Sequence, residues 1–205
     1  ALASWEGIAR AFNEKGGVAF INAGKVAFDD GVPSEEVTEI NSAQMQDLPP
    51  WDGARWDKYT MALATRFVKV HKPRFLMVSF NDTDAWAHEW NWNEYIKSLR
   101  AYDEWLKNLV KTLDELPGYG ENTSILITTD HGRGSGDQWG NHGEQYPEAQ
   151  DIWFFGYNPR AVACQNTAGR IYSHNDIRPT IERLLGLAPI QCEKCGRVME
   201  ELVSP

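Results

Sequence analysis

The chain has 205 residues, of which 42% are hydrophobic, and its 29 acidic and 20 basic residues give a formal net charge of −9. This acidic balance argues against nucleic acid and anionic membrane surfaces as partners, so an anionic substrate would need a local positive centre such as a metal ion. No apolar run approaches the roughly 20 residues of a membrane span, which argues against a transmembrane segment.

The first part of the chain predicts two strands and two helices, with a long polar stretch between them. Ser4 is expected to cap a helix that starts in the residues after it. A strand is expected at 17–24, and residues 24–50, which lack a clear period, predict a long loop with short helical turns. A helix is expected over 51–71, and a second strand at 74–80.

The second part continues the alternation of helices and strands. Apolar residues three and four positions apart predict a helix over 92–116, and β-rich runs predict strands at 124–130 and 151–157. Residues 174–187 predict a short turn and then a helix with Pro179 in its first turn. The alternation predicts an α/β fold, with a mostly parallel sheet flanked by helices, in a single domain over 1–205.

Two of the predicted strands are followed by potential metal ligands. Asp84 and His88 follow one strand and share a face if the segment is helical, whereas Asp130 and His131 stand directly at the end of another. Ligands bind beyond the carboxyl ends of strands in open parallel sheets. The glycine-rich loop after His131 would let the backbone return His142 toward the strand ends.

Each of these residues also has an ordinary structural explanation. Asp82 or Asp84 could cap a helix, His88 could pack at the surface, and His131 and His142 could be turn and loop residues. Independent loops seldom all end in carboxylates and imidazoles, however, and this combination of ligands suits Zn²⁺, Mn²⁺ or a similar divalent ion. The combination therefore favours a metal site.

The ordered motifs carry a resemblance to a known group of enzymes. The segments are "DAWAH" at 84–88, "TTDHG" at 128–132, "NHG" at 141–143 and "HNDIRPTIERLLGL" at 174–187. In this order they resemble the alkaline phosphatase superfamily, which includes nucleotide pyrophosphatase/phosphodiesterases, sulfatases and cofactor-independent phosphoglycerate mutases. The resemblance implies an alkaline phosphatase-like three-layer sandwich, incomplete in this chain, and a metal-dependent hydrolase or transferase of phosphate or sulfate esters.

The resemblance also implies a set of metal ligands. It makes Asp84, His88 and His142 ligands of one divalent ion, and Asp130 and His131 ligands of a second. Zinc is the first expectation, with manganese or another divalent ion as alternatives. Two such ions would neutralise charge on a small anionic ester substrate.

The chain departs from the superfamily pattern before residue 74. It has no counterpart of the early strand that ends in a metal-binding Asp and is followed by a Ser or Thr nucleophile. We therefore expect this chain to be the C-terminal part of a longer enzyme, with the nucleophile upstream of Ala1 and the missing N-terminal segment as its partner. The isolated chain is expected to bind metal partially or not at all, and to be inactive or nearly so.

Two other function classes stay open. One is a non-catalytic metal-binding or interaction module, and the other is a structural zinc protein that uses Cys164, Cys192 and Cys195 together with His174. Cys192 and Cys195 could instead form a local disulfide or remain two free thiols. A periplasmic or secreted location is favoured over the cytoplasm.

Two further features bear on the substrate. Arg133 could contact a bound anion or lie solvated in its loop. Four tryptophans near the predicted ligands could line a pocket for a base or sugar, or could simply pack: Trp86, Trp90, Trp92 and Trp139.

Overall fold

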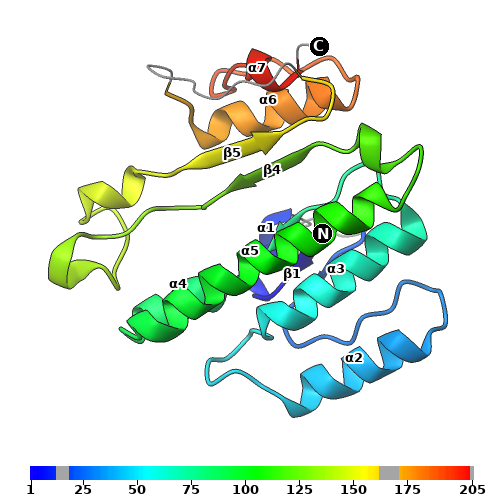
Figure 1. The fold of residues 1–205 in the computed structure, drawn as a ribbon. Helices are drawn as coiled ribbons and strands as arrows, with labels where there is room; N and C mark the ends of the chain where they lie inside the picture. The colour runs from blue at the N-terminus through cyan, green and yellow to red at the C-terminus, as the bar shows by residue number, and fades with distance from the viewer. Residues whose placement is uncertain (13–18, 162–170, 204–205) are drawn as a thin grey trace. The chain divides into compact units, whose positions relative to one another are not determined.

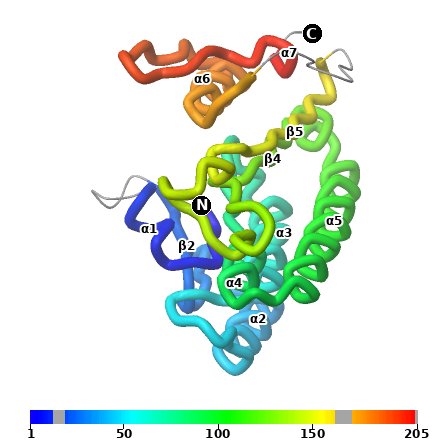
Figure 2. The backbone as a smooth tube through the Cα atoms, turned by 90° about the vertical axis from the view of Figure 1, so that its left-hand side faces the viewer, coloured from blue at the N-terminus to red at the C-terminus, as the bar shows by residue number. Residues whose placement is uncertain are grey.

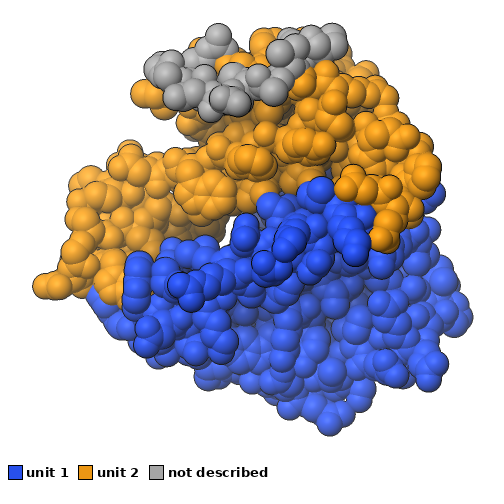
Figure 3. Space-filling model, viewed as in Figure 1, with its two compact units in different colours: residues 1–112 blue, residues 113–205 orange. Residues whose placement is uncertain are grey.

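The computed structural model describes residues 1–12, 19–161 and 171–203. The chain divides into two compact units, Ala1–Thr112 and Leu113–Pro205, which Figure 3 colours separately. The organisation of residues 1–205 as one domain stays a prediction. Within the described ranges, no helix combines the length and the hydropathy needed to cross a bilayer.

Unit 1 contains a small parallel sheet of three strands. Strand β1 (Leu2–Ala3) lies between β2 (Asn22–Ala23) and β3 (Val78–Ser79), and it pairs with both in parallel. The sheet and its helices confirm the predicted α/β class. Strand β1 was not predicted, because a strand of two residues is too short to show an alternating pattern.

Ser4 follows β1 directly and is fully buried. Its Oγ lies 2.7 Å from Oγ1 of Thr60, so it does not cap the next helix, α1, which spans Gly7–Phe12. The expectation of a helix cap at Ser4 was therefore wrong. The hydroxyl is used instead inside unit 1, where a buried polar group needs a hydrogen-bond partner.

Helix α3 packs against the sheet, and the two together form the core of unit 1. It spans Asp57–His71, and its residues Leu63 and Ala64 are buried with Leu2 of β1. Figure 1 shows α2 (Glu35–Gln46) beside α3, in the region that was expected to be a loop. That expectation failed because α2 buries only Val37 and Gln44, too few positions to mark a helical period.

The helix expected over 92–116 is confirmed as α5. It spans Trp92–Asp114 and follows the shorter helix α4, Asp82–His88. The predicted helix over 51–71 is confirmed in type but begins only at Asp57, because residues 51–54 form turns and a bridge.

A buried arginine connects the sheet to the neighbouring helices of unit 1. The Arg55 side chain is fully buried, and its guanidinium donates to the Thr60 hydroxyl (2.8 Å), to the carbonyl of Ala3 (3.1 Å) and to the carbonyl of Asn22 (3.2 Å). It also donates to the side-chain oxygens of Asn22 and Gln44. Burial lowers the pKa of Arg55 to about 10, while the charge of Asp57 opposes this shift.

Unit 2 contains a two-stranded antiparallel sheet. Strand β4 (Ile125–Thr128) pairs antiparallel with β5 (Phe154–Tyr157), so this pair differs from the parallel sheet of unit 1. Figure 2 follows the chain from β4 through the intervening loop to β5. Three short 3₁₀ helices complete this part of the chain: Gly120–Asn122, Gly136–Gln138 and Pro147–Gln150.

Helix α6 begins earlier than the sequence indicated. It spans His174–Leu184 with Ser173 and Asp176 in a capping box, so Pro179 lies inside the helix and not in its first turn. A proline at 179 cannot donate to the carbonyl of Asn175, and the N–H of Gly196 donates to that carbonyl instead (3.1 Å). The last described helix, α7, spans Glu200–Val203.

The cysteines do not support a structural zinc site. Cys192 and Cys195 are joined by a disulfide, as one of the alternatives anticipated, so neither sulfur can supply a thiolate. Cys164 lies outside the described residues. His174, the fourth ligand of that alternative, directs its Nε2 to the carbonyl of Thr129 at 2.7 Å.

Candidate functional site

In unit 1 the predicted ligands Asp84 and His88 lie on α4, directly after β3. Their spacing of four residues places them on one face of the helix, and Oδ2 of Asp84 lies 3.4 Å from Nε2 of His88. Two ligand atoms bound about 2.1 Å from a tetrahedral zinc ion lie about 3.4 Å apart. The pair therefore has the spacing of two ligands of one ion, and the same distance suits an ion pair if His88 is protonated.

The N-terminus of α4 is capped by a residue that lies more than 20 positions earlier in the sequence. Neither Asp82 nor Asp84 is the N-cap, which is Asn81, and the Asn81 side chain makes no capping hydrogen bond. The carboxylate of Asp57 instead accepts from the N–H groups of Asn81 (2.8 Å) and Asp82 (2.8 Å). This role of Asp57 was not predicted, because no local sequence pattern relates Asp57 to α4.

Asp57 and Asp82 are both removed from solvent. Asp57 is 0% exposed and Asp82 is 7% exposed. Burial raises the pKa of Asp57, and it raises the pKa of Asp82 to about 8 with a further contribution from the charge of Asp57. Tyr102, whose pKa burial also raises, donates its hydroxyl to Asp57.

Two of the four tryptophans near the predicted ligands, Trp86 and Trp92, pack against other aromatic residues. Trp86, on α4 between the two predicted ligands, packs edge-to-face with Trp51 at 4.9 Å and lies 6.0 Å from Trp56. Trp92 stacks on Tyr95 with ring centroids 5.5 Å apart. Because edge-to-face and offset ring pairs stabilise packing, the contacts of Trp86 fix α4 against the segment that contains Trp51 and Trp56.

In unit 2 the predicted ligands Asp130 and His131 follow β4. Nδ1 of His131 lies 2.8 Å from the carbonyl of Gly132, which can only accept, so Nδ1 carries the proton and Nε2 of the neutral ring carries the lone pair. That Nε2 lies 3.7 Å from Oδ2 of Asp130. A metal-binding histidine commonly donates its other N–H to a carbonyl in this way.

The glycine-rich loop returns His142 to His131, as expected. The two imidazole rings stack with centroids 3.8 Å apart. The loop is closed by the hydrogen bond from the N–H of Gly134 to the carbonyl of Asn141 (2.9 Å) and by the Arg133 guanidinium, which donates to Gly140 (3.3 Å). Arg133 therefore holds the loop that carries His142.

Gly132→Ala is expected to destabilise unit 2 by about 1–3 kcal/mol. A Cβ at this position would lie 2.3 Å from the carbonyl oxygen of Asp151 and 2.6 Å from that of Glu148, and backbone atoms cannot swing aside. Thermal unfolding measures the effect. Asp137→Ala, an exposed position in the same loop, is the control. Equal melting temperatures for the two variants would show that the close approach does not constrain the loop.

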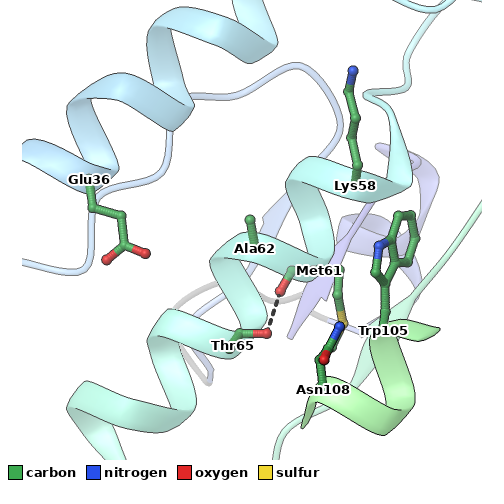
Figure 4. Close-up of a pocket in the computed structure, with 7 residues that line it drawn as sticks. All are labelled: Glu36, Lys58, Met61, Ala62, Thr65, Trp105 and Asn108. Atoms are coloured by element: carbon green, nitrogen blue, oxygen red, sulfur yellow. Dashed lines mark hydrogen bonds between the residues drawn. The ribbon is translucent and has the colours of Figure 1, made fainter. Parts of the chain in front are cut away.

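The pocket drawn in Figure 4 is lined by none of the predicted ligands. It has a volume of about 250 Å³ and lies among side chains of α2, α3 and α5, including Glu36, Lys58 and Trp105. Lys58 is already paired with Asp47. The pocket contains none of the carboxylate–histidine pairs, so we assign it no role in the chemistry.

Each unit thus supplies a carboxylate and an imidazole nitrogen with the spacing of two ligands of one metal ion. The oxygen–nitrogen distances are 3.4 Å for Asp84 and His88 and 3.7 Å for Asp130 and His131. Carboxylate oxygens and imidazole nitrogens are the ligands that Zn²⁺ and similar divalent ions take. The donor set of both units therefore fits a divalent metal.

Comparison with known proteins gives one family and two relatives. The family model described as type I phosphodiesterase / nucleotide pyrophosphatase matches residues 3–181. A 2,3-bisphosphoglycerate-independent phosphoglycerate mutase of Haloarcula marismortui is 26% identical over 171 residues, which cover 82% of this chain and 31% of the mutase. GPI ethanolamine phosphate transferase 1 of Mus musculus is 30% identical over 109 residues, covering 52% of this chain and 11% of the transferase. No solved structure matches the chain.

Proposed function

Because the chain belongs to the type I phosphodiesterase / nucleotide pyrophosphatase family, we propose that it supplies metal-binding residues of an enzyme that transfers phosphoryl groups from phosphate esters. This family is part of the alkaline phosphatase superfamily, so the resemblance seen in the sequence motifs is confirmed. The observation that carries the proposal is the match over residues 3–181, which includes both Asp–His pairs.

The proposed metal ligands follow the superfamily pattern. Within the units, Asp84 and His88 would hold one divalent ion, and Asp130 and His131 would hold a second, with zinc as the first choice. The ions, when bound, neutralise charge on the phosphoryl oxygens and activate the attacking group. The residues of the chain position the ligands: the carbonyl of Gly132 accepts a hydrogen bond from Nδ1–H of His131 and so orients its Nε2.

The nucleophile is proposed to come from sequence outside these 205 residues. The chain spans less than a third of the length of the mutase and about a tenth of the transferase that it matches. Ser4, the hydroxyl that follows β1, is fully buried and bonded to Thr60, which does not suit a group that must reach a substrate. A phosphate ester substrate is preferred over a sulfate ester on the family's description.

The purified 205-residue chain, loaded with zinc, is expected to hydrolyse a nitrophenyl phosphodiester no faster than zinc in buffer. The reason is that the proposed ligands are present while the nucleophile is not. The assay is repeated with EDTA and with a His88→Ala variant as controls. Turnover that EDTA and His88→Ala both abolish would contradict the assignment of the nucleophile to another segment.

We also propose a periplasmic or secreted location. The disulfide between Cys192 and Cys195 supports it, because protein disulfides persist mainly in oxidising compartments. Cell fractionation followed by thiol labelling tests the proposal, and a reduced, cytoplasmic protein would contradict it.

A further inference from the structure

The N-termini of α3 and α4 cap each other: the carboxyl group at the start of each helix accepts hydrogen bonds from N–H groups at the start of the other. Asp57 is the first residue of α3, and its carboxylate accepts from the N–H groups of Asn81 and Asp82, both at 2.8 Å. Asp82 is the first residue of α4, and its carboxylate accepts from the N–H of Asp57 at 3.3 Å. Each helix therefore receives its cap from the first residue of the other, although 25 positions separate the two residues.

Tyr102 of α5 completes the cap of α4. Its hydroxyl accepts from the N–H of Thr83 at 3.2 Å and donates to Oδ2 of Asp57. Asp57 and Tyr102 thus satisfy three consecutive N–H groups, those of Asn81, Asp82 and Thr83. These are the groups that a helix leaves without an internal partner in its first turn.

The cap matters because α4 is short. A helix of seven residues has little stability of its own, since the nucleation cost is spread over few hydrogen bonds. What fixes α4 is its caps and the packing of Trp86 against Trp51. Asp84 and His88 lie on this helix, two and six residues after its first residue, so their common direction depends on how α4 is held.

We propose that Asp57 is a positioning residue for the ligand pair Asp84 and His88, acting through the N-terminus of α4 and supported by Tyr102. The inference rests on the proposed function, in which that pair binds a metal ion. The carboxyl groups of Asp57 and Asp82 are both buried, and each lies at the N-terminus of the other's helix, where backbone N–H groups donate hydrogen bonds to it. Replacing the Asp57 carboxyl group would leave at least one of the N–H groups of Asn81 and Asp82 without its acceptor.

The test uses the full 205-residue chain with Asp57→Asn and Tyr102→Phe. Asparagine keeps one acceptor but places an NH₂ group toward a backbone donor, and phenylalanine removes only the hydroxyl. Hydrogen exchange of the amides of residues 81–88 is expected to become about tenfold faster in both variants. Asp103→Asn, an exposed carboxylate next to Tyr102, is the control and is expected to leave the exchange unchanged.

The second readout is Co²⁺ affinity, followed by the visible absorption of the bound ion. Both variants are expected to bind Co²⁺ about tenfold more weakly than the wild type, with the ligands themselves intact. If exchange over 81–88 or Co²⁺ affinity stays at the wild-type value in both variants, the positioning role is overturned. If the wild type binds no Co²⁺ while exchange in the variants rises, the proposed function fails and the capping of α4 by Asp57 is supported.

Discussion

Replacing Arg55 with lysine is expected to lower the free energy of unfolding by about 3–5 kcal/mol. The guanidinium lies fully buried and donates in three directions, to Thr60, to the backbone of Ala3 and to Asn22. A lysine carries its donors on a single nitrogen and cannot reach these acceptors together, so several buried oxygens lose their partner. Asp57, whose charge interacts with Arg55, would also lose the guanidinium as its neighbouring positive group.

Urea unfolding followed by circular dichroism measures this effect. The matched control is Arg10→Lys on α1, where the side chain is exposed and a change below about 0.5 kcal/mol is expected. If Arg55→Lys were as stable as Arg10→Lys, the buried hydrogen bonds of Arg55 would contribute nothing net to unit 1. The account of its polar interior would then be wrong.

His131→Ala is expected to weaken zinc binding at its site by about 100-fold or more. The reason lies in the orientation of the ring: Nδ1 donates to Gly132, and Nε2 points toward Asp130 at 3.7 Å. Alanine removes the ligand and also the ring on which His142 stacks. Competition with a chromophoric chelator measures the affinity.

His174→Ala is the matched control for this prediction. It removes a histidine from the same unit, but one whose Nε2 hydrogen-bonds the carbonyl of Thr129 and so carries a proton rather than a lone pair. Zinc affinity is expected to stay within about twofold of the wild type. Equal losses in the two variants would show that His131 has no special role as a ligand.

The features that the sequence predicted well are those that depend on short spacings. The interval of four residues between Asp84 and His88 fixes their common face once the segment is helical. The adjacency of Asp130 and His131 and the glycines before His142 likewise led to the observed arrangement within unit 2. Such relations are set by local backbone geometry.

The features that the sequence did not reveal depend on contacts between distant segments. Asp57 caps α4 across 25 positions, and Arg55 bonds to Ala3 across 52 positions. No periodic pattern marks either residue, because burial and hydrogen bonding decide their roles. The antiparallel pairing of β4 and β5 was missed for a related reason, since a β-rich run carries no information on its direction.

The proposal as a whole depends on metal binding by the two Asp–His pairs. Anomalous scattering at the zinc edge from crystals grown with zinc tests it most directly. We predict zinc peaks about 2.0–2.2 Å from a carboxylate oxygen and Nε2 of Asp84 and His88, of Asp130 and His131, or of both pairs. A map with no zinc at either pair, or with zinc only elsewhere on the chain, would contradict the account.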